Sequence, residues 1–257
     1  MKKTIITLMM ILAFTSTVVF AQGSKETAEE SKVITMATNA EWPPLEFVDQ
    51  DGNVTGFEME LLQKFSEVSD YTFTPINIAW DGIFAGLANG AYDGIASGVS
   101  VTEERKSAME FTTPFLLVTQ SIIVPTATGF EAAKIDELSS KKVGVQIGTT
   151  GDLMLQDSGY DVIIKSYDSI ALAVEDLLNG NLDAVVTDSV VAGEYVLGND
   201  AFKGKLKVTG TSEENVEPIA MAFPKGDTMH VEIVNNALKA LEENGTMDEL
   251  KAKWGIL

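Results

Sequence analysis

"WDGIFAGLANGAYDGIASGVSVTEERKS", residues 80–107, contains in order the patterns of a helix, a strand, a polar loop and a second helix. The first segment has helical apolar spacing and ends at glycine, whereas YDGIASG has the composition of a strand. Thr102 is a favourable N-cap for the second helix. A strand between helices of this length indicates a parallel sheet with helical crossovers.

The same alternation of strand and helix patterns extends in both directions along the chain. The further segments are 32–38, 56–69 and 71–78 before this stretch, and 141–148, 150–159, 160–167, 169–180 and 182–188 after it. In 56–69 and 169–180, apolar residues recur at the spacing of a helix with one buried face. The pattern predicts an α/β protein with two series of βαβ units.

Two β-rich segments, 115–125 and 205–225, join these series and lack the Gly/Ser composition of a loose linker. We therefore predict two lobes, each a mainly parallel sheet flanked by helices, joined by a two-strand hinge. The predicted limits are 33–118 with 210–257 for lobe 1, and 119–209 for lobe 2. The alternative is one larger doubly wound domain with a long mixed sheet.

The N-terminal residues have the features of a secretory signal peptide. Lys2 and Lys3 precede an apolar run, and small residues around Ala21 predict cleavage there, giving a signal peptide of residues 1–21. An uncleaved anchor helix is the alternative, although the run is short for a membrane span. Residues 22–32 are polar and are expected to form a flexible leader. The chain has no cysteine, and so no acceptor for a lipid anchor, which predicts a free periplasmic protein.

The composition argues against several classes of function. With 45% hydrophobic residues the chain has enough apolar content to fold, and its formal net charge of −20 makes nucleic acid a poor partner. The only histidine, His230, has no nucleophile motif nearby, and no metal-ligand spacing occurs. We therefore expect no catalytic residue, no metal and no cofactor.

Arg105 is the only arginine among 18 lysine and arginine residues. It lies one turn inside the second helix of the opening stretch, after a loop in which Gly98 permits close backbone approach and Ser100 offers a hydroxyl and an N–H. A planar guanidinium binds a carboxylate through two parallel hydrogen bonds, which an ammonium group does not reproduce. We expect Arg105 to bind a carboxylate, and a surface pair with a glutamate of its own helix is the alternative.

Two further strand ends carry polar groups. In VQIGTTGDL, residues 145–153, Thr149 and Thr150 begin a helix and offer hydroxyls and free N–H groups to an anion, unless they only cap the helix. The segment lacks the glycine patterns of nucleotide-binding loops. Asp188 ends an apolar strand, where it binds an ammonium group or a metal, or caps the next helix. Together with Arg105 it would bracket a zwitterion.

Two tryptophans stand at strand-to-helix transitions near the same sheet edge. Trp42 follows the first predicted strand, and Trp80 begins the helix of the opening stretch. Both are placed to form the flat walls of a pocket. For each of them, ordinary core packing is the alternative.

Several segments resemble the bacterial periplasmic solute-binding proteins for polar amino acids that serve ABC importers. They are PPLEFVDQDGNVTGFEMELL (43–62), the stretch from WDGIF to TTPF (80–115), KKVGVQIGTTGDL (141–153), LDAVVTD (182–188), IAMAFPKGD (219–227) and ALKALEENGTMDELKAKW (237–254). They follow the family's order and span nearly the whole chain beyond the leader. The resemblance implies the type II periplasmic binding protein fold, closure over one L-amino acid, a monomer, and a membrane permease as partner.

The resemblance also implies a role for each candidate residue. Arg105 would hold the α-carboxylate of the ligand, and Asp188 its α-ammonium group. The supporting positions are the main chain around Gly98, Ser100 and Thr150 at the α-carboxylate, the Gly98 carbonyl at the α-ammonium, Trp42 and Trp80 beside the side chain, and Asn39, Gln146, Ser97 and Thr149 at its polar end.

One departure from the family pattern bears on the identity of the ligand. Members that take cationic side chains often carry an acidic residue near the position of Asn39, which is neutral here. Trp42 and Trp80 still suit a guanidinium by stacking and cation–π contact, and VQIGTTGD (145–152) resembles arginine-binding members. Arginine and glutamine are therefore the leading ligands, with histidine and lysine behind them.

Two other functions stay open at this point. Some relatives of these proteins resemble dehydratases of cyclic acids, and a cyclohexadienyl-dehydratase-like enzyme would need a general acid with a shifted pKa. Glu41 and Glu46 are the acids near the first predicted strand, and neither has an evident partner in the sequence. The other alternative is a ligand-sensing module that contacts a receptor rather than an importer.

Overall fold

The computed structural model describes residues 32–256, except 213 and 214. The predicted signal peptide, 1–21, and residues 22–31 of the predicted leader lie outside this part of the chain. Within the described residues, no helix has both the length and the apolar character that are needed to cross a lipid bilayer.

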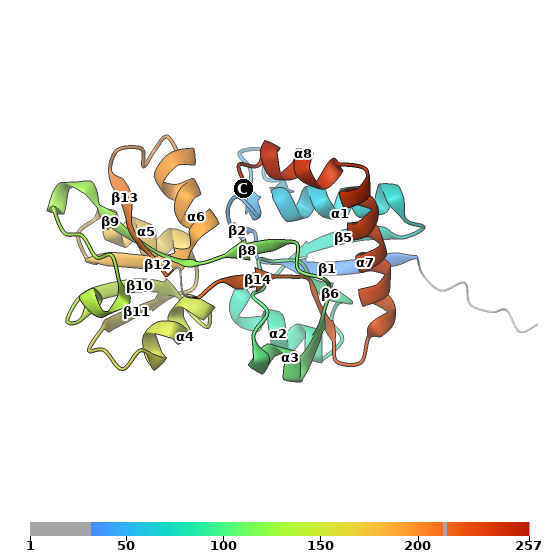
Figure 1. The fold of residues 1–257 in the computed structure, drawn as a ribbon, viewed down its shortest axis with the longest axis horizontal. Helices are drawn as coiled ribbons and strands as arrows, with labels where there is room; N and C mark the ends of the chain where they lie inside the picture. Colours follow the sequence, from blue (N-terminus) through green and yellow to red (C-terminus); the bar gives the residue numbers. More distant parts are fainter. Residues whose placement is uncertain (1–31, 213–214, 257) are drawn as a thin grey trace, which may run out of the picture. The chain divides into compact units, whose positions relative to one another are not determined.

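The first lobe contains a five-stranded sheet built from both ends of the described chain (Figure 1). Its strand order is β5 (Thr72–Asn77), β1 (Val33–Thr38), β6 (Gly94–Ile95), β15 (Ala222–Pro224) and β7 (Met109–Phe111). β1 is parallel to β5 and β6, whereas β15 is antiparallel to β6 and β7. The helices of this lobe are α1 (Phe57–Val68), α2 (Trp80–Ala88), α3 (Glu103–Ala108), α7 (Thr228–Glu243) and α8 (Thr246–Lys253).

The second lobe repeats this plan with a second five-stranded sheet. Its strand order is β11 (Ile163–Tyr167), β10 (Lys142–Gln146), β12 (Ala184–Asp188), β9 (Gln120–Pro125) and β13 (Leu206–Thr211). β10 is parallel to β11 and β12, and β9 is antiparallel to β12 and β13. The helices are α4 (Thr150–Asp157), α5 (Ile170–Leu178) and α6 (Ser189–Gly193), which a π-helical turn, Glu194–Gly198, continues. Short 3-10 turns cover Thr126–Thr128 and Ile135–Leu138.

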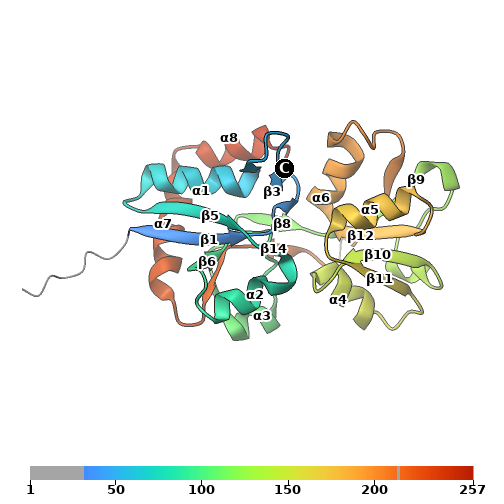
Figure 2. The same ribbon diagram turned by 180° about the vertical axis from the view of Figure 1, so that it is seen from behind.

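Two extended segments connect the lobes. β8 (Leu116–Val118) and β14 (Glu217–Ile219) pair in antiparallel fashion, and Figures 1 and 2 show them running side by side from one lobe to the other. The two-lobed architecture with a two-strand hinge is therefore confirmed. The exact domain limits stay a prediction, and the limit placed between residues 209 and 210 falls within β13.

Helical spacing predicts the buried faces of the helices well. On α1, the four apolar residues at helical spacing, Phe57, Leu61, Leu62 and Phe65, are all fully or almost fully buried. α1 packs on β5 and on the C-terminal helices α7 and α8, so the end of the chain covers the first lobe. A small three-stranded sheet lies between β1 and α1 along the chain, and its strands are β2 (Glu41–Trp42), β3 (Glu46–Val48) and β4 (Val54–Thr55).

The segment YDGIASG forms less strand than its composition predicts. Only Gly94–Ile95 pairs as β6, and the chain then leaves the sheet as a loop that reaches Ser100. Gly98 has a φ of +56°, and a Cβ atom there would lie 3.0 Å from Cδ1 of Trp42. The left-handed turn at a glycine ends the strand and brings the loop backbone against an indole ring. We call residues 97–100 the site loop below.

Candidate functional site

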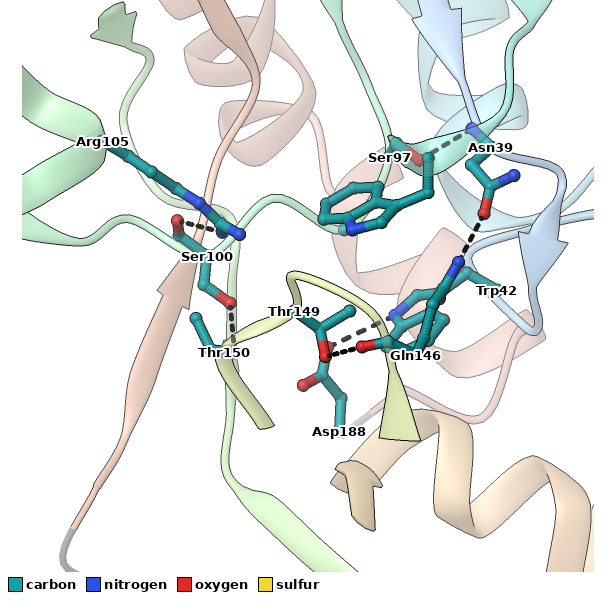
Figure 3. A pocket seen from close by; sticks show the side chains of 11 residues that line it. Asn39, Trp42, Ser97, Ser100, Arg105, Gln146, Thr149, Thr150 and Asp188 are labelled. Carbon is teal, nitrogen blue, oxygen red and sulfur yellow. Dashed lines mark hydrogen bonds between the residues drawn. The ribbon is translucent and has the colours of Figure 1, made fainter. Parts of the chain in front are cut away.

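All eleven candidate residues line one hollow, which has about 320 Å³ of empty space including the part open to solvent. The first lobe supplies Asn39, Trp42, Trp80, Ser97, Gly98, Ser100 and Arg105, and the second supplies Gln146, Thr149, Thr150 and Asp188. Figure 3 shows their side chains converging from strand ends and helix starts of both lobes. This is the sheet edge at which open α/β sheets bind ligands.

The Arg105 guanidinium is held by backbone carbonyl groups and an aromatic ring. Nη1 donates to the Ser100 carbonyl at 3.0 Å, and Nη2 to the Gly148 carbonyl of the second lobe at 3.5 Å. Its Cζ lies 4.9 Å from the ring centre of Phe84. The guanidinium forms no ion pair with any carboxylate of the described residues, and the nearby Glu103 pairs with Lys106 instead. The surface ion pair is therefore absent, and the guanidinium keeps its charge for another partner.

The Asp188 carboxylate points into the pocket and does not cap α6. Its Oδ2 accepts a hydrogen bond from Nε1 of Trp42 at 3.3 Å, and its Oδ1 accepts one from Nε2 of Gln120 at 2.6 Å. Burial and the nearby charge of Glu217 raise the pKa of Asp188 to about 7, against these hydrogen bonds and the charge of Arg105. A cation beside Asp188 would favour its ionised form.

The start of α4 combines helix capping with a position in the pocket. Oγ1 of Thr149 accepts from the N–H of Asp152 at 3.4 Å and donates to the Gln146 carbonyl at 2.8 Å, so this threonine is an N-cap. Thr150 Oγ1 instead lies 3.5 Å from the Ser100 hydroxyl, across the two lobes. The capping alternative therefore holds for Thr149, which also lines the pocket.

At the other end of the pocket, two amide side chains join the lobes. Nε2 of Gln146 donates to Oδ1 of Asn39 at 3.1 Å and to the Asp168 carbonyl at 3.0 Å. The Oε1 atom of Gln146 is buried and has no hydrogen-bond partner among the described residues. An unpaired buried acceptor is costly, so this end of the pocket is suited to a ligand that donates hydrogen bonds.

Both tryptophans serve the core and the pocket together. Trp42 and Trp80 are 7% and 8% exposed; Trp80 packs within a hydrophobic cluster of the first lobe, and Trp42 within a cluster that extends over both lobes. Each also presents part of its ring system to the hollow. Core packing and a place in the pocket lining are therefore compatible for both residues.

Two buried glutamates support the site loop from behind, and the sequence patterns did not single them out as part of the site. Glu58, in the first turn of α1, accepts from the N–H of Gly98 at 2.7 Å, and Glu46 accepts from the Ser97 hydroxyl at 3.0 Å. That hydroxyl in turn accepts from the backbone N–H of Asn39. Glu46, noted from the sequence as an acid without a partner, therefore has one.

Burial changes the protonation of both glutamates. Burial raises the pKa of Glu58 to about 8, and the hydrogen bond from Gly98 opposes this. Burial together with the charge of Glu58 holds the pKa of Glu46 well above its usual range. The available sequence signal is that both acids interrupt otherwise apolar, buried segments, at LEFV and FEMELL.

A second hollow of about 780 Å³ adjoins the first, and Asn39 and Trp80 line both. Three acidic residues also line this second hollow: Glu41, Asp81 and Asp168. Three carboxylates beyond the amide end of the pocket favour the approach of a positive group. They line the same hollow as Asn39, which is itself neutral.

Comparison with known proteins agrees with this architecture. The family model for bacterial extracellular solute-binding proteins, family 3, matches residues 34–256. A probable histidine-binding protein of Neisseria gonorrhoeae is 35% identical over 230 residues, which cover 88% of this chain and 84% of that protein.

Solved structures resemble the chain over most of its length. An ancestral arginine-binding protein bound to arginine has a TM-score of 0.81 and 31% identity, covering 87% of this chain and 98% of that one. An ancestral arginine-binding protein bound to glutamine has a TM-score of 0.81 and 30% identity, covering 88% and 99%. With a family model that matches nearly all described residues, the chain belongs to the bacterial extracellular solute-binding proteins of family 3.

Proposed function

We propose that this protein binds a polar L-amino acid between its two lobes and delivers it to an ABC importer. One observation carries the proposal: a single pocket has the Arg105 guanidinium on one lobe and the Asp188 carboxylate on the other. Such a pair matches the α-carboxylate and the α-ammonium group that every amino acid carries. The names of similar proteins, which bind histidine, arginine or glutamine, support the same class of ligand.

The proposed binding mode uses the groups that face the pocket. Arg105 pairs with the ligand carboxylate, assisted by N–H groups of the site loop and of the first turn of α4. Asp188 accepts from the α-ammonium group, and its negative charge becomes favourable once that cation is present. The side chain then extends between Trp42 and Trp80 toward Asn39 and Gln146.

Closure follows from the division of these contacts between the lobes. A ligand that touches one lobe gains the contacts of the other only when the cleft closes, so it stabilises the closed state. Charge-assisted hydrogen bonds contribute about 1.5–3 kcal/mol each, and a few of them shift such an equilibrium strongly. Trp42 bonds Asp188 directly, and Asn39 bonds Gln146. The ligand would engage these same side chains.

Among amino acids, we propose arginine as the first ligand and glutamine as the second. The hollow that contains Glu41, Asp81 and Asp168 adjoins the amide end of the pocket, and it offers negative charge to a guanidinium. The unpaired Oε1 of Gln146 would accept from a guanidinium or an amide. Histidine and lysine remain candidates, and histidine has the support of a similar protein's name.

The remaining parts of the proposal concern the partner and the location. We propose a monomer that is exported to the periplasm and meets a membrane permease there. The alternatives are a sensing module on a receptor and an enzyme that turns its ligand over. For the enzyme, Asp188 would be the acid with a shifted pKa that lines the pocket.

A thermal-shift screen of the twenty amino acids, followed by calorimetry, tests the function. A ligand that binds only the folded state raises the melting temperature by mass action, and at about 100 times its Kd it adds about 2.7 kcal/mol of stability. We expect a clear shift with arginine, a smaller one with glutamine, and one site per chain. The amino acid should be recovered unchanged, by chromatography, after prolonged incubation. No shift with any amino acid, or consumption of the ligand, would contradict the proposal.

A further inference from the structure

The amide nitrogen of Gln120 faces more hydrogen-bond acceptors than it has hydrogens. Nε2 lies 2.6 Å from Oδ1 of Asp188, 3.1 Å from Oε1 of Glu217 and 3.2 Å from Oγ1 of Thr150. A primary amide carries two hydrogens, which suffice for one oxygen of each carboxylate only if the Thr150 hydroxyl takes neither of them. Gln120 and Asp188 are also direct cross-strand neighbours on β9 and β12, which fixes them close together.

Among these acceptors, Glu217 has the fewest hydrogen-bond donors for its oxygen atoms. It is the first residue of the hinge strand β14, opposite Val118 of β8. Its Oε1 has Gln120 as partner, and its Oε2 is buried without any partner among the described residues. Exchanging the amide O and N atoms of Gln120 gives no relief, because an oxygen would then face Oδ1 of Asp188 at 2.6 Å.

The charges around this point are also out of balance. Asp188 faces Arg105 from α3, Glu217 from β14 and Glu46 from β3. Arg105 is the only cation among these groups, whereas Asp188 and Glu217 are both carboxylates that share Gln120. Glu217 also acts electrostatically on Arg105, which places it near both charged ends of the pocket although it does not line the hollow. Buried carboxylates without a sufficient number of donors or cations are unstable as charged groups.

We propose that Glu217 is a positioning residue for the ligand's α-ammonium group: by sharing Gln120 with Asp188, it leaves this carboxylate pair short of one donor, which the ammonium supplies. The inference rests on the proposed function. Without a ligand, a proton held by Asp188, whose pKa burial raises to about 7, lessens the shortage, and the arriving ammonium group releases that proton. Closure at the hinge thereby depends on a cationic amino group and not only on the ligand's carboxylate.

A thermodynamic cycle between Glu217 and the α-ammonium group tests the inference. The Kd values of arginine and of its deamino analogue, 5-guanidinopentanoate, are measured by calorimetry for the wild-type protein and for Glu217→Gln. The glutamine side chain supplies its own donor and lacks the charge, so it removes the shortage. We expect the preference for arginine over the analogue to fall about tenfold in the variant, equivalent to about 1.4 kcal/mol of coupling.

The control variant is Glu104→Gln, which removes the same charge from an exposed glutamate beside Arg105. It should leave the preference unchanged. A purely structural role of Glu217 would weaken both ligands equally, and an unchanged preference in Glu217→Gln would overturn this inference while leaving the proposed function intact. If the wild-type protein binds no amino acid, the proposed function fails and this inference with it. Where the screen selects another amino acid, its own deamino analogue replaces 5-guanidinopentanoate.

A second measurement needs no variant. Calorimetry of arginine binding in phosphate and in Tris at pH 7 gives the number of protons released, because the two buffers have different ionisation enthalpies. We expect a measurable fraction of a proton to be released with arginine and less with the deamino analogue, which has no ammonium to replace the bound proton. Equal release with both ligands, or none with arginine, would overturn the inference.

Discussion

Arg105 gains its place in the site through contacts that only its planar side chain can make. Its guanidinium bonds two carbonyl groups from different lobes and lies against the ring of Phe84. These contacts orient the group and leave N–H donors for a carboxylate, since no acidic residue of the described chain pairs with it. The lone arginine in a lysine-rich composition therefore has a geometric explanation.

Arg105→Lys should weaken amino-acid binding although the charge is kept. An ammonium group loses one of two parallel hydrogen bonds and the stacking on Phe84, so we expect Kd to rise by about tenfold to a hundredfold, or roughly 1.5–3 kcal/mol. Calorimetry with arginine measures this. The matched control is the inverse exchange at the next residue, Lys106→Arg, which should bind normally because Lys106 is exposed. If Arg105→Lys binds arginine with near-normal affinity, the guanidinium does not hold the ligand's carboxylate in the way proposed.

At the scale of elements, the site loop is shaped by α1 and β3, which lie behind it. The first turn of α1 provides Glu58 for the N–H of Gly98, and β3 provides Glu46 for the hydroxyl of Ser97. The helix start favours a negative charge, but burial outweighs this, and the raised pKa of Glu58 keeps its carboxyl protonated near neutral pH. The loop conformation therefore depends on an acceptor at residue 58 and not on its charge.

Replacing Glu58 by methionine and by glutamine separates the need for a hydrogen-bond acceptor at residue 58 from the need for a negative charge there. Glu58→Met leaves the buried N–H of Gly98 without an acceptor, which costs about 1–3 kcal/mol, and we expect weaker arginine binding and faster hydrogen exchange at Gly98. Glu58→Gln keeps an acceptor oxygen and should bind almost as the wild type does. Glu60→Met serves as the control, because Glu60 lies in the same turn but contacts Lys253 and Trp254 instead. If both Glu58 variants lose the same amount of arginine affinity, the negative charge of Glu58 and not its acceptor oxygen supports the site loop.

At the scale of the whole described molecule, three buried acids have pKa values above their ordinary range. The pKa of Asp188 is raised to about 7 and that of Glu58 to about 8, and the pKa of Glu46 is raised well above its usual range. In the unfolded chain these groups ionise at their ordinary values near pH 4. Between about pH 4 and pH 8 the folded state therefore binds more protons than the unfolded state does. The free energy of unfolding must then fall as pH rises through this window.

The ligand-free protein should consequently unfold more easily at pH 8 than at pH 5, by roughly a few kcal/mol. Urea unfolding followed by circular dichroism at several pH values measures this slope. Glu58→Gln removes one titrating group and should flatten the slope between about pH 6 and pH 8. In Glu60→Gln the slope there should not change, because the Lys253 and Trp254 hydrogen bonds lower the pKa of Glu60 and it is ionised in both states. A stability that is constant or rises with pH would show that the buried acids are ionised.

Much of the fold follows from patterns within a few residues of each other. Helical spacing marks the buried face of α1, and Thr102 caps α3 as its residue type predicts. Arg105 in α3 and Asp188 at the end of β12 also line one pocket. Strand direction places both at the sheet edge where open α/β sheets bind ligands. β6 is shorter than the strand that its composition predicts, and the chain beyond it turns at Gly98, close to Trp42.

Patterns among neighbouring residues are enough to predict the alternation of strands and helices and the two-lobed plan, and the polar strand ends point to Arg105 and Asp188. The other residues that line the pocket, such as Asn39, follow from the resemblance to a known family. The buried acids that support the pocket from outside its lining depend on contacts between residues that are far apart in the chain. Glu58 meets Gly98 from 40 positions away, Glu217 meets Gln120 from 97, and Trp42 meets Asp188 from 146. The protonation of an acid depends on its burial and on the charges packed around it, and no local pattern contains either.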